Sequence, residues 1–196
     1  MAETDTANGA TTDAGTESEP AAKPQRKRIT RRQAVEQRAR SYFEAMDRRD
    51  PDAMLEHWSE DGVEDVVPVG LMRGPDELRA FFASLFDAIP DARTTVTRVI
   101  PDEHSCAVEW RLEGTFGGEP YMGVDANGRH VEMRGCDVLE FEDGQITHLT
   151  AHSDGIGFAR QIGLLPPDGS GADRAMKGAF NAATRFRRAV AERRDG

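Results

Sequence analysis

Apolar residues recur at helical spacing in three segments of the first half of the chain. The first segment, residues 30–48, has Thr30 in the position of an N-cap. A short second helix begins at Asp50-Pro51, because Asp caps free amides and Pro suits the first turn. The third helix starts at Gly74-Pro75 and ends before Pro90. The predicted buried faces are Val35, Ala39, Tyr42, Phe43 and Met46; Met54, Leu55 and Trp58; and Leu78, Phe81, Phe82, Leu85, Phe86 and Ile89.

After Pro90 the period of the pattern changes from helical to two, which predicts strands over 93–100, 104–115, 129–142 and 145–153. An earlier short strand, 62–69, places Val63, Asp65 and Val67 on one face. Helices followed by a meander of strands predict an α+β fold, in which a cone-shaped, curved antiparallel sheet wraps around the N-terminal helices.

Beyond Gly171 the spacing alternates between four and three, which is typical of a coiled-coil seam or a docking helix. We expect this extra C-terminal helix to dock on its own domain, and a sister subunit is the alternative. The seam consists of Ala172, Met176, Ala179, Ala183, Phe186 and Val190.

Composition divides the chain into three parts. Residues 1–28 contain almost nothing that could be buried, so we expect a disordered tail. Residues 29–166 hold the folded domain, and 167–196 hold the C-terminal helix. The sequence has no apolar run that could cross a bilayer or serve as a signal peptide, which predicts a cytoplasmic protein with no membrane partner.

The net charge of −10 is unevenly distributed. Residues 41–170 contain 26 acidic and 10 basic residues, whereas residues 23–40 and 171–196 are basic. A body this acidic repels a phosphate backbone, so we expect no nucleic-acid partner. We interpret the basic stretch 23–40 as a solvated linker and helix start.

One strand carries an acid on an otherwise apolar face. In residues 129–142, Asp137 shares a face with Val131, Met133, Leu139 and Phe141, so it is predicted to be buried. A buried carboxylate must be paired or must stay protonated with a raised pKa. A protonated acid in a pocket can donate a hydrogen bond to a substrate oxygen. The alternative is a structural aspartate bonded to backbone amides or to Arg111.

Two further polar groups point toward the same predicted core, namely Asp65 on its strand and Tyr42 on the first helix. Together with Asp137 they could supply a general base and two oxyanion donors. The large apolar residues predicted to line a substrate pocket around them are Trp58, Phe82, Phe86, Trp110 and Met133.

On the last strand, His152 and Asp154 share a face with His148, which predicts a His-Asp pair at the mouth of the pocket. A spacing of four residues on a strand separates His148 and His152 by about 13 Å, too far for one ion. We therefore predict no metal site. Nothing in the sequence calls for a cofactor.

Several runs of residues resemble the nuclear transport factor two-like superfamily, in particular its SnoaL-like polyketide cyclase and ketosteroid isomerase branch. The similarity covers residues from about 31 to 165. The runs are Tyr42 to Asp50, Val63-Glu64-Asp65, Pro75 to Phe86 and Cys136 to Ile146.

By this resemblance, Tyr42 matches the isomerase's oxyanion tyrosine, Asp65 its proton-shuttling base and Asp137 its protonated oxyanion partner. Asp154 matches the acid/base aspartate of the cyclases. The resemblance implies a cofactor-independent isomerase or cyclase that acts on a small hydrophobic carbonyl compound and forms a homodimer. The alternative is a non-catalytic ligand-binding or assembly module on the same scaffold.

Overall fold

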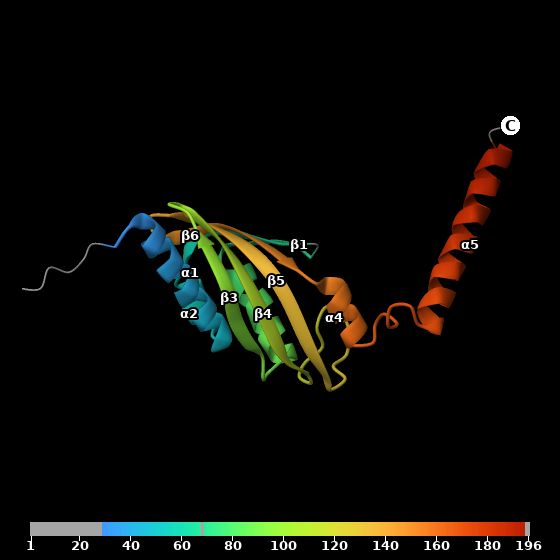
Figure 1. Ribbon diagram of the computed structural model, residues 1–196, viewed down its shortest axis with the longest axis horizontal. Helices are drawn as coiled ribbons and strands as arrows, with labels where there is room; N and C mark the ends of the chain where they lie inside the picture. Colours follow the sequence, from blue (N-terminus) through green and yellow to red (C-terminus); the bar gives the residue numbers. More distant parts are fainter. Residues whose placement is uncertain (1–28, 68, 195–196) are drawn as a thin grey trace, which may run out of the picture.

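A computed structural model describes residues 29–67 and 69–194 of the chain. The predicted disordered tail, residues 1–28, therefore lies outside the described residues. Five helices and six strands follow one another in the order predicted, with two short additions (Figure 1). The elements are α1 Arg31–Asp47, α2 Pro51–Leu55, β1 Trp58–Val67, β2 Gly70–Arg73, α3 Gly74–Ala88, β3 Arg93–Pro101, β4 Ser105–Phe116, β5 Arg129–Glu142, β6 Gln145–Ser153, α4 Gly155–Gln161 and α5 Gly171–Arg194.

The strands form one curved, open sheet in the order β2-β1-β6-β5-β4-β3. All neighbours are antiparallel except β1 and β6, which run parallel because the long connection through α3 and the meander returns the chain beside β1. Helices α1 to α3 pack against one face of this sheet (Figure 1). The predicted α+β class, the curved sheet and the extra C-terminal helix are thus confirmed.

Helix termini follow the local chemistry of the sequence. Thr30 caps α1 in a reciprocal capping box with Gln33, as its position predicted. Asp50 caps α2 and accepts a hydrogen bond from the amide of Ala53. The predicted faces of α1 and α3 are buried, and Tyr42, Phe43, Phe82 and Leu78 are among the most enclosed side chains. The helices therefore fill the concave side of the sheet.

Two of the shorter elements escaped the sequence analysis. β2 extends the sheet edge by pairing antiparallel with β1. α4 follows β6 directly, and its Phe158 packs edge-on against Phe116 and Tyr121 with ring centroids 6.1 and 6.3 Å apart. Among the described residues, no helix is long and apolar enough to cross a membrane.

Candidate functional site

Tyr42 lies at the centre of the packed interior. It comes from the inward face of α1 and is 1% exposed. Its ring makes edge-on contacts with the rings of Phe43, Trp58 and Phe82 at 5.4, 6.2 and 6.5 Å between centroids. These contacts fix the direction of the phenol, so its hydroxyl oxygen can serve as a positioned polar group inside an apolar shell.

Asp137 is buried on the inward face of β5, as the alternation of that strand predicted. It is 3% exposed, and its Oδ1 atom has no hydrogen-bond partner. On the adjacent strands its neighbours in register are Val108 and Ala151, both of which are apolar and buried. The structural alternative that we considered, a bond to Arg111, is not formed, because Arg111 pairs with Glu113 and Glu132 on the outer face.

The inward-facing acid of β1 is Glu64, and the prediction that Asp65 faces the core is wrong. Glu64 is 3% exposed, whereas Asp65 is only half-buried and lies on the opposite face of the strand. The run from Val63 to Val67 has valines on both faces, so alternation alone could not decide between them. The structure buries Gly62, Glu64 and Val66, which are directed toward α3.

Glu64 and Asp137 are close enough to influence each other. Both lie on the inward face of the sheet, on the two strands that flank β6. Burial raises the pKa of Asp137 to about 7, and the indole of Trp110 offsets part of that rise. Burial, followed by the charge of Asp137, raises the pKa of Glu64 well above its usual value. Both carboxyls therefore hold their protons to higher pH than an exposed acid does, and ionisation of Asp137 makes ionisation of Glu64 harder.

The same two carboxylates act on the phenol. The pKa of Tyr42 is raised well above its usual value by burial and then by the charges of Glu64 and Asp137. Tyr42 therefore stays protonated over the physiological pH range. Its hydroxyl is a hydrogen-bond donor beside two acids.

Each of two tryptophans in this cluster lies over a glycine. A Cβ atom on Gly62 would come within 2.6 Å of Trp58 Cε3, and a Cβ on Gly135 would overlap the ring of Trp110. Only glycine therefore admits either indole at these points. The Nε1 atoms of Trp58 and Trp110 lie near Tyr42 and Asp137 but outside hydrogen-bonding geometry, so both are buried without a partner, like Glu64 Oε2 and Asp137 Oδ1. Four unpaired polar atoms thus belong to this inner cluster, which we define as Tyr42, Trp58, Glu64, Trp110 and Asp137.

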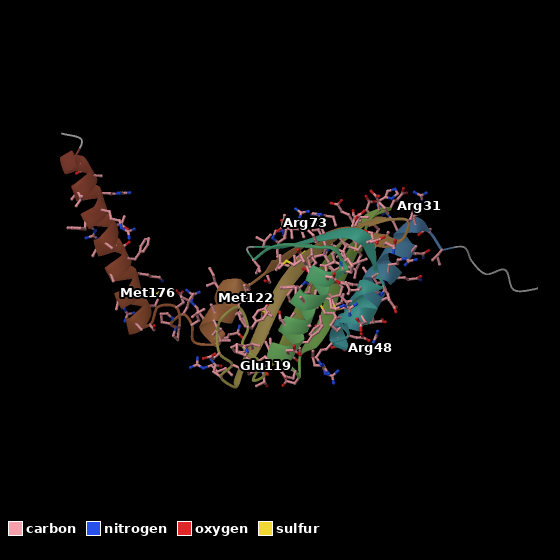
Figure 2. The ribbon with its side chains drawn as sticks, turned by 180° about the vertical axis from the view of Figure 1, so that it is seen from behind. Arg31, Arg48, Arg73, Glu119, Met122 and Met176 are labelled. Carbon is pink, nitrogen blue, oxygen red and sulfur yellow. The ribbon has the colours of Figure 1, made fainter. Side chains whose placement is uncertain are left out.

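Tyr121, on the loop between β4 and β5, joins the cluster from the open end of the cone. The pKa of Tyr121 is raised to about 12 by burial and then by the charge of Glu64. The sequence pattern did not single out this tyrosine. Figure 2 shows the part of this loop that carries Glu119 and Met122 at the same end of the sheet as α4.

The residues predicted to contact a substrate all lie on the core side. Trp58, Phe82, Phe86 and Trp110 are at most 7% exposed, and Met133 is partly buried against the same core. Trp58 begins β1, whereas the sequence had placed it on the second helix. A role in substrate contact stays a prediction for these five residues.

His152 and Asp154 do not join the site, so the expected pair at the pocket mouth is wrong. A bulge at Thr147, where Phe141 pairs with Ile146 but Glu140 pairs with His148, adds one residue to β6. The extra residue turns the following side chains over, and Leu149 and Ala151 face inward instead. His152 is exposed as a result.

Asp154 has a structural task, since it is the N-cap of α4. Its Oδ1 accepts a hydrogen bond from the amide of Gly157 at 2.8 Å. Its position after the strand, directly before Gly155, is the sequence signal for this role. Asp154 is exposed and lies on the rim of the domain.

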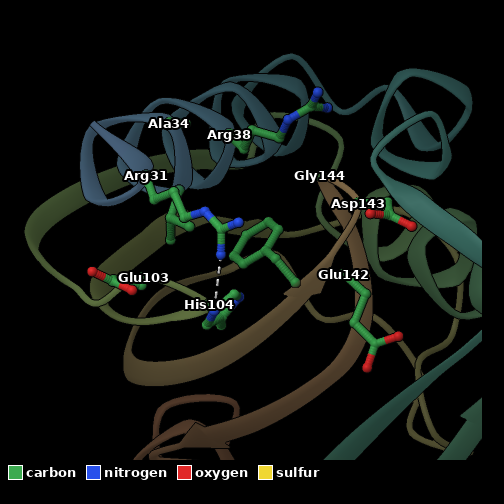
Figure 3. A pocket seen from close by; sticks show the side chains of 10 residues that line it. Arg31, Ala34, Arg38, Glu103, His104, Glu142, Asp143 and Gly144 are labelled. Atoms are coloured by element: carbon green, nitrogen blue, oxygen red, sulfur yellow. Dashed lines mark hydrogen bonds between the residues drawn. The ribbon is translucent and has the colours of Figure 1, made fainter. Parts of the chain in front are cut away.

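The grooves found on the surface are separate from the inner cluster. The first, of about 490 Å³, lies between α1 and the β5–β6 turn (Figure 3). Arg31 and His104 meet across it, with Arg31 Nη1 and His104 Nε2 3.3 Å apart. Two further surface grooves lie beside Val138 and Thr147 and beside Phe43 and Thr94, and none of the three is lined by Tyr42, Glu64 or Asp137. Within residues 29–67 and 69–194, no three His, Cys, Asp or Glu side chains are grouped to hold a metal ion.

Comparison with known proteins places this arrangement in a family. A family model described as the SnoaL-like domain matches residues 39–149, which is more than half of the chain. A search of curated proteins gave no match.

Solved structures share the fold over the whole domain. A candidate SnoaL-like polyketide cyclase from a Jannaschia species is 19% identical, with a TM-score of 0.65 over 72% of this chain and 99% of that one. A candidate polyketide cyclase from Xanthomonas campestris is 25% identical, with a TM-score of 0.60 over 68% and 99%. A Catenulispora acidiphila protein described as having a ketosteroid isomerase-like fold is 18% identical, with a TM-score of 0.56 over 68% and 96%. The resemblance noted in the sequence is thereby confirmed for the fold.

Proposed function

We propose that this chain, which belongs to the SnoaL-like domain family, binds a small, largely apolar carbonyl compound inside the cone and moves a proton on the carbon beside the carbonyl. The observation that carries the proposal is the buried acid pair, Glu64 and Asp137, in which each acid has a carboxyl oxygen without a partner. An unsatisfied buried polar group costs about 1–3 kcal/mol. A ligand that forms hydrogen bonds with these oxygens recovers that free energy. The cluster should therefore bind an apolar molecule that carries one or two polar atoms.

The two acids suit different halves of a proton transfer. Asp137, with a pKa of about 7, can be ionised at neutral pH and act as the base. It takes the proton from the carbon next to the carbonyl, and the electron pair of that C–H bond becomes the carbon–carbon double bond of an enolate. Glu64, whose pKa is raised by burial and then by the charge of Asp137, stays protonated when Asp137 is ionised and donates to the enolate oxygen together with Tyr42. Return of the proton to another carbon completes an isomerisation, and its return to the same carbon gives isotope exchange. In an aldol cyclisation the enolate carbon attacks a second carbonyl carbon, and the alkoxide oxygen formed there takes the proton from Asp137.

These roles differ from those that the resemblance implied. Asp137 was the expected donor and Asp65 the expected base, but Asp65 faces outward, and the charge of Asp137 adds to burial in raising the pKa of Glu64. The base is therefore assigned to Asp137 and the donor to Glu64. No cofactor takes part in this scheme.

A ligand panel tests the binding half of the proposal. The panel contains β-tetralone, hydroxylated anthrones and a steroid ketone, each added in a thermal-shift measurement to the full chain and to two variants. We expect at least one ketone to stabilise wild type and Asp65→Asn alike, by about 2.7 kcal/mol at a concentration one hundred times its Kd. Glu64→Gln combined with Asp137→Asn should weaken this stabilisation. Equal stabilisation of all the proteins would place the ligand outside the cluster.

A second candidate function is a non-catalytic binding or assembly module on the same scaffold. The closure of the cluster favours it, since Tyr42, Glu64 and Asp137 are at most 3% exposed. A module of this kind binds without proton transfer. Ligand stabilisation without isotope exchange in the bound ketone would identify it.

A further inference from the structure

Helix α5 stands apart from the domain that it follows. It runs for 24 residues from Gly171 to Arg194 and projects away from the sheet (Figure 1). Met176 lies on this projecting helix, well away from the packed body (Figure 2). The prediction that the C-terminal helix docks on its own domain is therefore wrong, and its apolar stripe is uncovered in a single chain.

The stripe consists of large exposed apolar groups in a regular pattern. Met176, Phe186 and Val190 are 43%, 71% and 40% exposed, and Phe180 beside them is 69% exposed. Seam residues follow one another at alternating four and three spacing, from Ala172 to Val190. That period brings one face of a helix repeatedly against another helix of the same period.

A network of hydrogen bonds surrounds the first turn of α5. Asp173 is 1% exposed and accepts hydrogen bonds from Lys177 Nζ at 2.7 Å and from the amide of Gly169 at 3.1 Å. Asp168 receives hydrogen bonds from both Lys177 and Arg160 of α4, at 3.2 and 3.3 Å. The bonds to Asp168 link the start of α5 to α4.

The other long helices of the domain have no free apolar face to offer. The inward stripes of α1 and α3 are buried in the core. Among the described residues, α5 is thus the long helix with an uncovered apolar seam. A helix that covers this seam must have a seam of the same period. We propose that α5 pairs antiparallel with α5 of a second copy of this chain.

An antiparallel arrangement matches the seam to itself by size. With the two-fold axis near Asn181, Ala172 lies opposite Val190 and Met176 lies opposite Phe186 of the second copy. Ala179 and Ala183 meet at the centre, where small side chains let the two backbones approach closely. Each large residue thus meets a different residue, whereas parallel pairing would place Phe186 against Phe186 and Val190 against Val190.

Charge favours the same direction. In the antiparallel register Asp173 flanks the seam opposite Arg187 of the second copy, and the remaining bases lie mainly on the outer faces of the pair. A helix of 24 residues is about 36 Å long, so antiparallel pairing keeps the two acidic domains at opposite ends. Parallel pairing would bring two bodies, each with 26 acids against 10 bases in residues 41–170, to one end.

Sedimentation of the full chain tests the pairing. We expect a concentration-dependent dimer for wild type and a monomer for Met176→Glu combined with Phe186→Glu, which places charges in the same seam layer. Asn181→Glu combined with Ala191→Glu is the matched control, because it adds the same charge on the outer face and should stay dimeric. Circular dichroism and the melting transition of the domain should be unchanged in both, since α5 does not cover the core.

A wild type that is monomeric at all concentrations would overturn the proposal. Binding of this basic amphipathic helix to an anionic surface would then be the alternative. A dimer that survives the seam charges would also overturn it, because another face would then hold the copies together.

Cysteine cross-linking tests the direction in a chain whose half-buried Cys136 is replaced by Ser. Ala182 lies beside the axis and should meet Ala182 of the second copy, so Ala182→Cys alone should form a disulfide-linked dimer. Ala175→Cys alone should not, but Ala175→Cys together with Ala189→Cys should. Cross-linking of Ala179→Cys in preference to Ala182→Cys would indicate parallel helices and contradict the register.

Discussion

Glu64 and Asp137 lie on the same inward face of the sheet, on the two strands that flank β6, and each has a buried carboxyl oxygen without a partner. Burial raises the pKa of both acids, and the charge of Asp137 raises that of Glu64 further from its usual value. An acid pair in an apolar interior costs stability that a purely structural core would avoid. The domain retains both, and the proposed proton transfer gives each of them a role.

The buried acids should make stability depend on pH. Asp137 titrates near 4 in the unfolded chain and at about 7 in the folded protein, so the folded state binds more protons between these values. The contribution of Asp137 to the free energy of unfolding is therefore fully present below pH 4. It is lost as the pH rises through 7, and the loss is on the order of 4 kcal/mol. Asp137→Asn removes this loss, so its stability relative to wild type should grow from pH 5 to pH 8.

Urea unfolding at a series of pH values measures this difference. Carboxylates whose pKa is lowered, such as Glu132 beside Arg134, contribute the opposite slope at lower pH, but they are common to both proteins and cancel. A difference in the free energy of unfolding that is independent of pH would show that Asp137 titrates normally.

Adjacent residues on β1 provide a paired test of the face assignment. Glu64→Gln should abolish or sharply reduce proton transfer and should stabilise the protein above pH 7, because it removes a buried acid with a raised pKa. Asp65→Asn, one position along on the outer face, should leave ketone binding and exchange within twofold of wild type. The reverse result would restore the assignment that the sequence first suggested.

The glycine beneath Trp110 should be irreplaceable. A Cβ atom at position 135 would overlap the indole and come within 2.6 Å of the carbonyl oxygen of His152. Gly135→Ala should therefore destabilise the domain by about 1–3 kcal/mol, the usual cost of overpacking, and weaken ketone binding. Gly117→Ala is the control, because its Cβ would meet only Thr115, at 3.5 Å or more. Chemical denaturation measures the free energy of unfolding of both variants. Equal stability of Gly135→Ala and Gly117→Ala would contradict the packing described.

Asp154 should matter for stability and not for chemistry. Asp154→Ala removes the cap of α4 and should cost about 1 kcal/mol in unfolding free energy, whereas Asp154→Ser retains a capping oxygen and most of the stability. Isotope exchange into a bound ketone should be unchanged at saturating ligand. A loss of exchange in both variants, with stability intact, would instead support the acid/base role that the family resemblance implied.

The sequence predicted the helices and the four-strand meander because their apolar periods are long and are ended by proline or glycine. The position of Asp137 followed from six alternating positions on one strand. Glu64 was missed because the short strand around it has valines on both faces, and His152 was misplaced because a one-residue bulge at Thr147 reverses the alternation. Neither feature has a signal in a single sequence, since both are set by pairing between strands.

Tyr121 and α5 show the limit for tertiary placement. Nothing in the local sequence distinguishes Tyr121, whose ring packs against Phe158 from α4. The seam of α5 was visible in the sequence, but its placement away from the domain is a tertiary feature that a period along one helix does not predict.

The central claim is that Glu64 and Asp137 move a proton on a bound ketone. Its most direct measurement is the exchange of protons beside the carbonyl of β-tetralone in D₂O, followed by proton NMR as a function of pH with wild type, Asp65→Asn, and Glu64→Gln combined with Asp137→Asn. We predict that wild type and Asp65→Asn accelerate exchange at least tenfold over the double variant, with a rate that rises as the pH passes through 7. Exchange by wild type that is no faster than by the double variant, under conditions where the ketone is bound, would contradict the account and leave the domain as a binding module.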